Sequence, residues 1–193
     1  NLEFARKEGI ATGTELIFGL PGETLNSMKK VIDTVLDLRF DSVALGVLWL
    51  LKGSEIGTPQ TRDEYQYQSR FMLSENAITY VKDSLSIEWD EIAVASKNYT
   101  FEEWKSFIQF TFIFEFMVFF GYARELLYHA MTFGIKASDF FQELIDCPEK
   151  YTTINRISKS YRDKYIENLF ESEEDLINFV KQNLNNWLKN NDE

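Results

Sequence analysis

The sequence contains almost none of the residues that bind transition metals or crosslink a chain. It has one cysteine, Cys147, and one histidine, His129, among 193 residues. One cysteine cannot form an internal disulfide, a zinc site of several thiolates or a thiolate-bound iron–sulfur cluster. One histidine argues against a histidine-rich metal site or a Cys–His dyad. We therefore predict no metal ligand and no catalytic residue within this sequence, and we interpret His129 as a hydrogen-bonded structural side chain.

Basic residues are also scarce. There are 20 lysines and arginines against 31 aspartates and glutamates, which gives a formal net charge of -11 at pH 7. An acidic chain does not attract a phosphate backbone over long range, so we expect no nucleic-acid partner. Without cysteines to form disulfides, the sequence favours a reducing compartment, and we predict a cytoplasmic location.

Long uninterrupted apolar runs are absent. The most apolar stretch, residues 107–120, contains seven phenylalanines but is interrupted by Gln109 and Glu115. It is shorter than the roughly 20 residues that a membrane-spanning helix needs. We therefore expect no membrane partner, and we interpret this stretch as a central buried helix or as one packed against a further domain.

Hydrophobic residues are nevertheless abundant. They make up 45% of the sequence, and aromatic residues 16%, which is enough for a buried core and too much for a disordered chain. The length allows one large domain or two small ones. Because the pattern changes near residue 96, we predict an α/β domain at 1–96 and a helical subdomain at 97–193.

A βαβ unit is predicted near the start of the sequence. Residues 13–18 indicate a strand, 25–38 carry apolar side chains at helical spacing after a Thr24 cap, and 42–51 are almost continuously apolar. Two parallel strands do not make a stable sheet alone, and an open sheet edge invites further pairing. We therefore expect the edge to be covered by other segments, or the fragment to self-associate.

The first residues resemble the end of a helix. Residues 1–8 are amphipathic, and Gly9 suits the position just beyond a helix C-terminus. Because a protein rarely begins inside an element, we expect an N-terminal portion of the same protein to precede these residues and to be their main partner.

The remainder is expected to change from loop to helix. Residues 52–85 predict a loop-rich connection with helical portions, and 89–96 predict one more strand. Thr100 and Glu103 form a capping-box pattern that opens a helix to Phe133, bent near Gly121.

Three shorter helices should follow. We expect Ser138 to cap one that ends at Cys147, before Pro148. Two more are predicted at 151–168 and 173–189, the last of them capped by Ser172.

The most informative segment runs from Glu15 to Thr24 and reads Glu-Leu-Ile-Phe-Gly-Leu-Pro-Gly-Glu-Thr. Its glycines let the backbone approach a ligand closely. In βα architectures, such a loop lies at the carboxyl edge of the sheet, where ligands bind. Strand alternation puts Glu15, Ile17 and Gly19 on one face, so Glu15 would point into a barrel lumen beside an apolar wall. No Gly-Lys-Ser/Thr follows, so this is not a Walker loop.

Residues 17–24 resemble the late-strand GLPGET motif of radical S-adenosylmethionine (radical SAM) proteins. At the right spacing, residues 47–56 are similar to the sixth barrel strand of that family and to its end, and the ordered pair is more specific than either part. The resemblance covers residues 1–57 well and 58–85 loosely. It implies an α/β fold in which 1–96 supplies the C-terminal βα units of a partial TIM-like barrel, followed by a mainly helical subdomain.

The resemblance also implies a function. In radical SAM proteins a [4Fe–4S] cluster, held by a CxxxCxxC loop, cleaves S-adenosylmethionine to a 5′-deoxyadenosyl radical. The implied activity is that of an iron–sulfur oxidoreductase or a methyltransferase-like enzyme acting on a small molecule or a peptide. Ile17 and Gly19 would lie beside the adenine. The implied cofactor-binding residues are Glu15, Ile17, Gly19, Leu20, Pro21, Gly22, Leu48 and Leu51.

The sequence departs from the family pattern at the cluster, because the three cysteines are missing. The cluster would therefore belong to the rest of the parent protein, and this chain alone should be inactive. Segments 92–95, 100–104 and 134–144 are similar to C-terminal extensions of radical SAM proteins that also carry a cobalamin-binding domain. That weaker resemblance leaves cobalamin open as a further cofactor.

A non-catalytic helical interaction or scaffold module is the alternative interpretation. Its aromatic helical face would dock a partner, and the βαβ unit would be a scaffold. A polar cavity beside Glu15 and Gly19 would favour the enzyme, and a solid apolar core there would favour the module.

Overall fold

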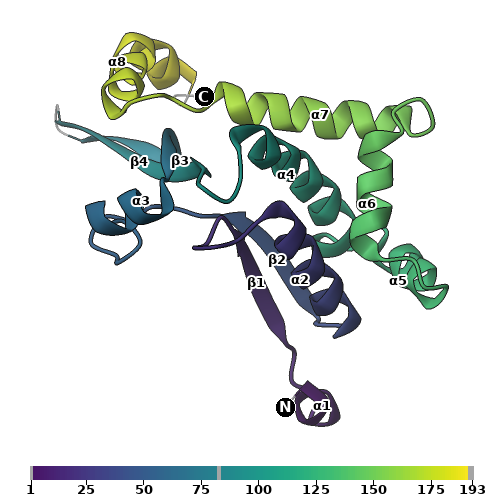
Figure 1. Cartoon of the computed structure of the whole chain (residues 1–193). Helices are drawn as coiled ribbons and strands as arrows, with labels where there is room; N and C mark the ends of the chain where they lie inside the picture. The colour runs from purple at the N-terminus through teal and green to yellow at the C-terminus, as the bar shows by residue number, and fades with distance from the viewer. Residues whose placement is uncertain (1, 82–83, 191–193) are drawn as a thin grey trace.

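A small parallel sheet, an antiparallel hairpin and a group of helices make up the structure (Figure 1). The computed structural model describes residues 2–81 and 84–190. Within these residues, the strands form two two-stranded sheets and no closed barrel. The predicted class, an α/β first part followed by a mainly helical second part, is confirmed.

The first part contains the predicted βαβ unit. After a short helix, α1 (Leu2–Lys7), come strand β1 (Gly13–Phe18), helix α2 (Leu25–Asp37) and strand β2 (Ser42–Val47). The two strands pair in parallel along their whole length. The second strand is shorter than the expected 42–51, because the chain leaves the parallel pair after Val47.

Helix α2 begins where the sequence predicts. The backbone N–H of Ser27 donates to Thr24 Oγ1 at 3.0 Å, and the N–H of Thr24 donates to Ser27 Oγ at 2.8 Å. This reciprocal capping satisfies amides that the first helical turn leaves free. Met28, Ile32 and Leu36 form the buried stripe of the helix. The amphipathic pattern thus determines which face of α2 meets the core.

The connection after β2 differs from the prediction. The structure has helix α3 (Pro59–Tyr65) and then a long strand, β3 (Gln68–Val81), which pairs antiparallel with β4 (Ser84–Ala95). The prediction of a loop-rich connection over 52–85 is therefore wrong for its second half, which forms strand β3. A polar Ser-Glu-Asn segment interrupts the apolar residues of β3, so no period of two is sustained in the sequence. The backbone hydrogen bonds to β4 decide the conformation instead.

Strand β4 of this hairpin also forms backbone hydrogen bonds with the segment that follows β2. The N–H of Leu50 donates to the carbonyl of Glu91 at 2.8 Å, and the N–H of Ala93 donates to the carbonyl of Leu48 at 3.0 Å. The segment just after β2 is therefore held by an antiparallel neighbour.

An ion pair ties α3 to the hairpin. Arg62 donates to both carboxylate oxygens of Glu91, at 2.6 and 2.7 Å, and Ser69 donates to the same carboxylate at 2.6 Å. Burial alone would raise the pKa of Glu91, but the hydrogen bonds from Arg62 and Ser69 outweigh it and hold that pKa below the ordinary 4.5. A carboxylate of this kind stabilises the fold above its unfolded-state pKa, and the stabilisation is lost as the pH falls through the folded-state value.

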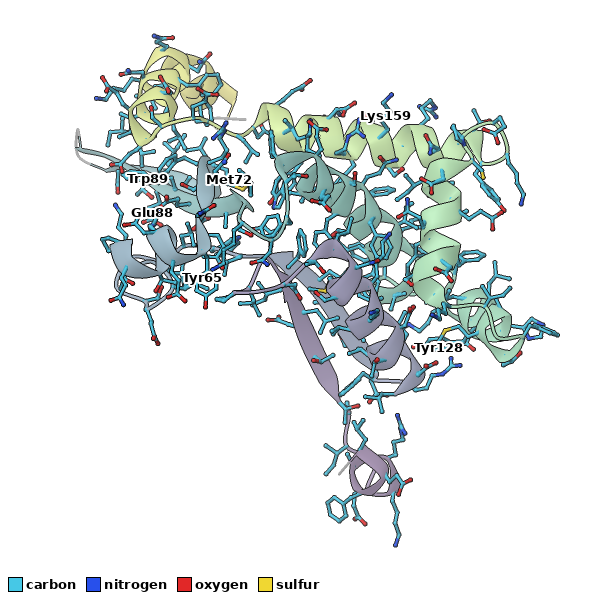
Figure 2. All side chains as sticks on the ribbon, viewed as in Figure 1. Tyr65, Met72, Glu88, Trp89, Tyr128 and Lys159 are labelled. Carbon is cyan, nitrogen blue, oxygen red and sulfur yellow. The ribbon has the colours of Figure 1, made fainter. Side chains whose placement is uncertain are left out.

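We expect Arg62→Ala to lower the free energy of unfolding by about 1–3 kcal/mol at pH 7, because it leaves a partly buried carboxylate without its partner. The difference from the wild type should shrink as the pH falls below 4.5. Urea denaturation at several pH values measures it. Lys159→Ala is the matched control: Lys159 is exposed on the outer side of the molecule (Figure 2), so it should change stability by no more than about 0.5 kcal/mol. A pH-independent loss in Arg62→Ala would contradict the ion-pair interpretation.

The second part of the chain is helical. Its elements are α4 (Phe101–Phe114), the π-helix η1 (Glu115–Phe119), α5 (Arg124–Thr132), α6 (Ala137–Asp146), α7 (Thr152–Glu167) and α8 (Glu173–Asn190). The predicted caps at Thr100 and Ser172 are confirmed: the N–H of Glu103 donates to Thr100 Oγ1 at 3.2 Å, and the N–H of Asp175 donates to Ser172 Oγ at 3.1 Å.

A single helix over 100–133 is wrong. The α-helix ends at Phe114, and a π-helical turn continues it to Phe119. The bend between this segment and the next helix, α5, is 95°. Gly121 takes a positive φ of 75°. The guanidinium of Arg124 donates to the carbonyl of Val118 at 2.9 Å. The expected bend near Gly121 is present, but as a break whose free carbonyl is satisfied by a side chain from the next helix.

Ser138 does not cap α6, contrary to the prediction. The N-cap position is Lys136, without a side-chain hydrogen bond. Both the N–H and the hydroxyl of Ser138 donate to the carboxylate of Asp33 on α2, each at 2.8 Å. The hydroxyl of Ser138 thus bonds to Asp33, which is distant in sequence, and not to the start of its own helix. This bond links α6 to α2. The expected end of this helix at Cys147 is confirmed.

Side chains from both parts share the main hydrophobic core. The ring centroids of Phe18 on β1 and Phe107 on α4 are 4.4 Å apart, and those of Phe110 and Phe141 are 5.3 Å apart. The central buried helix expected over 107–120 is confirmed only as far as Phe114, where α4 ends. Beyond it, Phe116, Phe119 and Phe120 are exposed. The predicted boundary at 96/97 is crossed by this core and stays a prediction.

No single helix among residues 2–81 and 84–190 is long and apolar enough to cross a membrane. Helices α4–η1 and α5 satisfy that criterion only as a pair, and the pair is bent by 95°.

Candidate functional site

The two faces of the parallel sheet differ in burial. Phe18 is fully buried in the core with α2, whereas Ile17 is 40% exposed and Glu15 is also exposed. The alternation along β1 agrees with the predicted face for Glu15 and Ile17, whereas Gly19, predicted on the same face, is buried. The exposed face is where a ligand can reach the sheet.

A cavity of about 550 Å³ opens on this face. Its walls come from β1, from β2 and the segment that follows it, and from the helices α4, η1 and α7. The residues that line it are Glu15, Ile17, Leu20, Leu45, Gly46, Val47, Leu48, Trp49, Leu51, Ser54, Ile56, Ile108, Thr111, Glu115, Tyr161 and Tyr165. Its volume lies within the range of roughly 300–1,000 Å³ that is usual for small-molecule sites.

The structure brings together part of the predicted cofactor-binding set. Two groups can be separated by whether they line the cavity. The residues that do so are Glu15, Ile17, Leu20, Leu48 and Leu51. The residues that do not are Gly19, Pro21 and Gly22, so their role at a cofactor rim stays a prediction.

Gly19 is packed against protein rather than open to the cavity. A Cβ atom at this position would lie 2.8 Å from the hydroxyl oxygen of Tyr99 and 3.2 Å from Leu48 Cβ. Tyr67 donates its hydroxyl to the carbonyl of Gly19 at 2.9 Å, and the N–H of Gly19 donates to Glu23 at 2.8 Å. The close contact that Gly19 permits is therefore with the side chains of Tyr99 and Leu48. Burial raises the pKa of Glu23, although the N–H of Gly19 favours its charged form.

Several cavity residues have no counterpart in the sequence-based prediction. Trp49, Tyr161 and Tyr165 place aromatic rings on the wall, and Glu115 adds a carboxyl group from the π-helix. The tyrosines lie on α7, more than 100 residues from β1 in the sequence, and no local pattern connects them. Glu115 does carry a signal: it is the one acidic residue in the Phe-rich stretch.

The cavity is largely apolar and contains two carboxyl groups, those of Glu15 and Glu115. Burial raises the pKa of Glu115 above its ordinary value. Burial, together with the neighbouring Tyr161 and Glu115, raises the pKa of Tyr165 to about 12, so this phenol stays neutral at physiological pH. The site can therefore enclose an apolar body and offer carboxyl and phenol groups to it.

A second, shallower cavity of about 400 Å³ lies along the hairpin. Trp89 and Glu88 of β4, both labelled in Figure 2, line it together with Lys52. The ammonium group of Lys52 lies 5.3 Å from the centroid of the Trp89 ring and 3.9 Å from a Glu173 carboxylate oxygen. Its one basic group is thus already engaged with protein partners.

The residues present do not fit an iron–sulfur cluster. Among residues 2–81 and 84–190 no group of three His, Cys, Asp or Glu side chains could hold a metal ion. Cys147 ends α6, and the ring of His129 packs edge-on against Phe133 at 5.1 Å. The main cavity has a volume and mostly apolar walls that are usual for small organic ligands.

Neither a protein-family model nor a curated protein matches this sequence, so the resemblance to radical SAM proteins rests on the motif residues and their positions in the fold.

Proposed function

We propose that this chain is the C-terminal barrel segment and helical extension of a radical SAM enzyme. The observation that carries the proposal is the position of the GLPGET turn. It ends β1 of a parallel pair, and a cavity lined by Ile17, Leu20 and Leu48 opens beside it. Ligands of open and closed α/β sheets bind at the carboxyl ends of the strands.

The partial TIM-like barrel is part of the same proposal. β1 pairs with β2 alone, and within the described residues its other edge has no strand partner. An interrupted barrel would leave such an edge. In this proposal, earlier strands and the cluster cysteines lie outside residues 1–193, and the N-terminal portion of the parent protein covers the edge.

The cavity residues have defined roles in the proposal. Ile17, Leu20, Leu48 and Leu51 form apolar walls for the adenine of S-adenosylmethionine. When bound, that cofactor supplies a 5′-deoxyadenosyl radical or a methyl group. Because no group of side chains among residues 2–81 and 84–190 could hold the cluster, the cluster belongs in this proposal to the rest of the parent protein. Cobalamin, the cytoplasmic location and the lack of nucleic-acid and membrane partners stay predictions.

Filling the cavity tests the proposal. Gly46 lies in β2 and lines the cavity, and a Cβ there would come no nearer than 4.0 Å to any other heavy atom. Gly46→Val should therefore preserve the fold while it occupies the space of a ligand. We expect adenosine and S-adenosylmethionine to bind the 193-residue chain in calorimetry, and Gly46→Val to weaken both by about tenfold or more.

The matched control is Gly13→Val. Gly13 lies in β1, and a Cβ there would make only ordinary contacts of 3.7 and 3.8 Å with Ser42. It does not line this cavity. Binding should be unchanged. If the wild type binds neither adenosine nor S-adenosylmethionine, the enzyme proposal fails. The coding sequence upstream gives a second check, since a CxxxCxxC motif in frame before several βα units is required.

A specific observation favours the alternative, a non-catalytic interaction module. Aromatic rings gather on the surface around η1, where Phe116 and Tyr122 lie 5.1 Å apart and Phe119 and Phe120 lie 5.2 Å apart. All four side chains are exposed. Exposed apolar clusters of this kind often mark interaction surfaces. The absence of nucleoside binding in the experiment above would leave this interpretation.

A further inference from the structure

Glu115 is placed unusually for a carboxyl group. It opens the π-helix η1, on the continuation of the most apolar helix in the chain, and its side chain lines the main cavity. It is partly buried, and burial raises its pKa. Among the described residues, no hydrogen bond or ion pair reaches its carboxylate oxygens. Glu115 therefore presents to the cavity a partly buried carboxyl group that no side chain of the described residues pairs with.

The rest of the cavity does not supply the missing positive charge. Its second carboxylate, Glu15, comes from β1 and likewise has no hydrogen-bond or ion-pair partner among the described residues. No lysine, arginine or histidine is among the residues that line the cavity. In contrast, Lys52 in the neighbouring cavity is already paired with Glu173 and lies over the ring of Trp89. The residues that line the cavity therefore offer no positive group to Glu115, and a ligand can supply one.

The aromatic lining points to the same ligand chemistry. Trp49, Tyr161 and Tyr165 contribute rings to the wall. The faces of such rings attract cations, and their area suits an apolar or aromatic body. The π-helical turn is an independent sign, because such turns are frequent at functional sites. Here that turn carries the carboxyl group in question.

We propose that the cavity selects a substrate that carries a protonated amine beside an apolar or aromatic body, and that Glu115 pairs with the amine. This inference rests on the proposed function, because it names the substrate class of the same cavity. Glu15 adds a second carboxyl group, and the aromatic rings together with the apolar walls at Ile17 and Leu48 contact the apolar body.

Phenethylamine and phenethyl alcohol are suitable probes, because they share shape and differ in the protonated amine. We expect the wild-type 193-residue chain to bind the amine at least about tenfold more tightly than the alcohol at pH 7 in calorimetry. Glu115→Gln keeps size and hydrogen-bonding capacity but removes the charge, and should lower that preference by about fivefold or more, while Glu15 and the rings retain a remainder. Glu125→Gln removes the same charge from an exposed position on α5 and should leave it unchanged. Adenosine, which is neutral, should bind all three proteins equally.

The outcomes separate the two proposals. Amine preference that falls in Glu115→Gln and is kept in Glu125→Gln supports the inference. Equal binding of amine and alcohol by the wild type, or a preference that is undiminished in Glu115→Gln, overturns it, even if adenosine still binds. The absence of adenosine binding to the wild type instead overturns the proposed function, whatever the amine does.

Discussion

Replacement of Phe107 by alanine should destabilise the protein more than any other change considered. Phe107 is 1% exposed, and its ring joins α4 to β1 through Phe18 at 4.4 Å and stacks on Phe110 at 6.4 Å. Removal of a large buried ring costs about 3–5 kcal/mol, because the transfer free energy is lost and a cavity remains. For a chain of this length, the melting temperature should fall by about 10 °C.

Phe120→Ala is the matched control for this change. The same chemical group is removed from a side chain that is 61% exposed, near the break after η1. Its effect on the free energy of unfolding should stay within about 0.5 kcal/mol. Chemical denaturation of the two variants beside the wild type measures both values. Similar losses in the two would mean that the core formed by α4 and β1 is not where the structure puts it.

The second large effect is expected at Gly19. Its φ of 109° is unfavourable for any residue with a Cβ, and the added atom would lie 2.8 Å from Tyr99 Oη and 3.2 Å from Leu48 Cβ. Backbone strain and steric overlap together should make Gly19→Ala cost about 2–4 kcal/mol. The loss is measured by thermal and urea denaturation.

Gly22→Ala separates strain from overlap. Gly22 also has a positive φ, of 80°, but a Cβ there would meet nothing within 4 Å. Only the backbone strain remains, so Gly22→Ala should lower the free energy of unfolding by about 1–2 kcal/mol. Tyr99→Phe in the Gly19→Ala background removes the overlapping oxygen and should recover part of the loss. Equal costs at the two glycines would show that the contact with Tyr99 is unimportant.

The candidate site could be predicted in part. The order of residues along β1 suffices to put Glu15 and Ile17 on one face, because a strand alternates regardless of what surrounds it. It does not reveal that Gly19 would be covered by Tyr99, or that Glu115 and Tyr165 would complete the cavity. Those contacts join segments 80 to 150 residues apart, and no local pattern carries that information.

Sequence by itself determined the features that depend on neighbours within one or two turns. The caps at Thr24, Thr100 and Ser172 are bonds over three residues, and the stripe of α2 follows from a 3.6-residue period. Tertiary structure decided the rest. β3 is a strand because β4 pairs with it, and Ser138 binds Asp33 because α6 packs on α2. Such choices arise only when distant segments compete for the same hydrogen bonds and buried area, which is why the cavity beside β1 exists only in the folded chain.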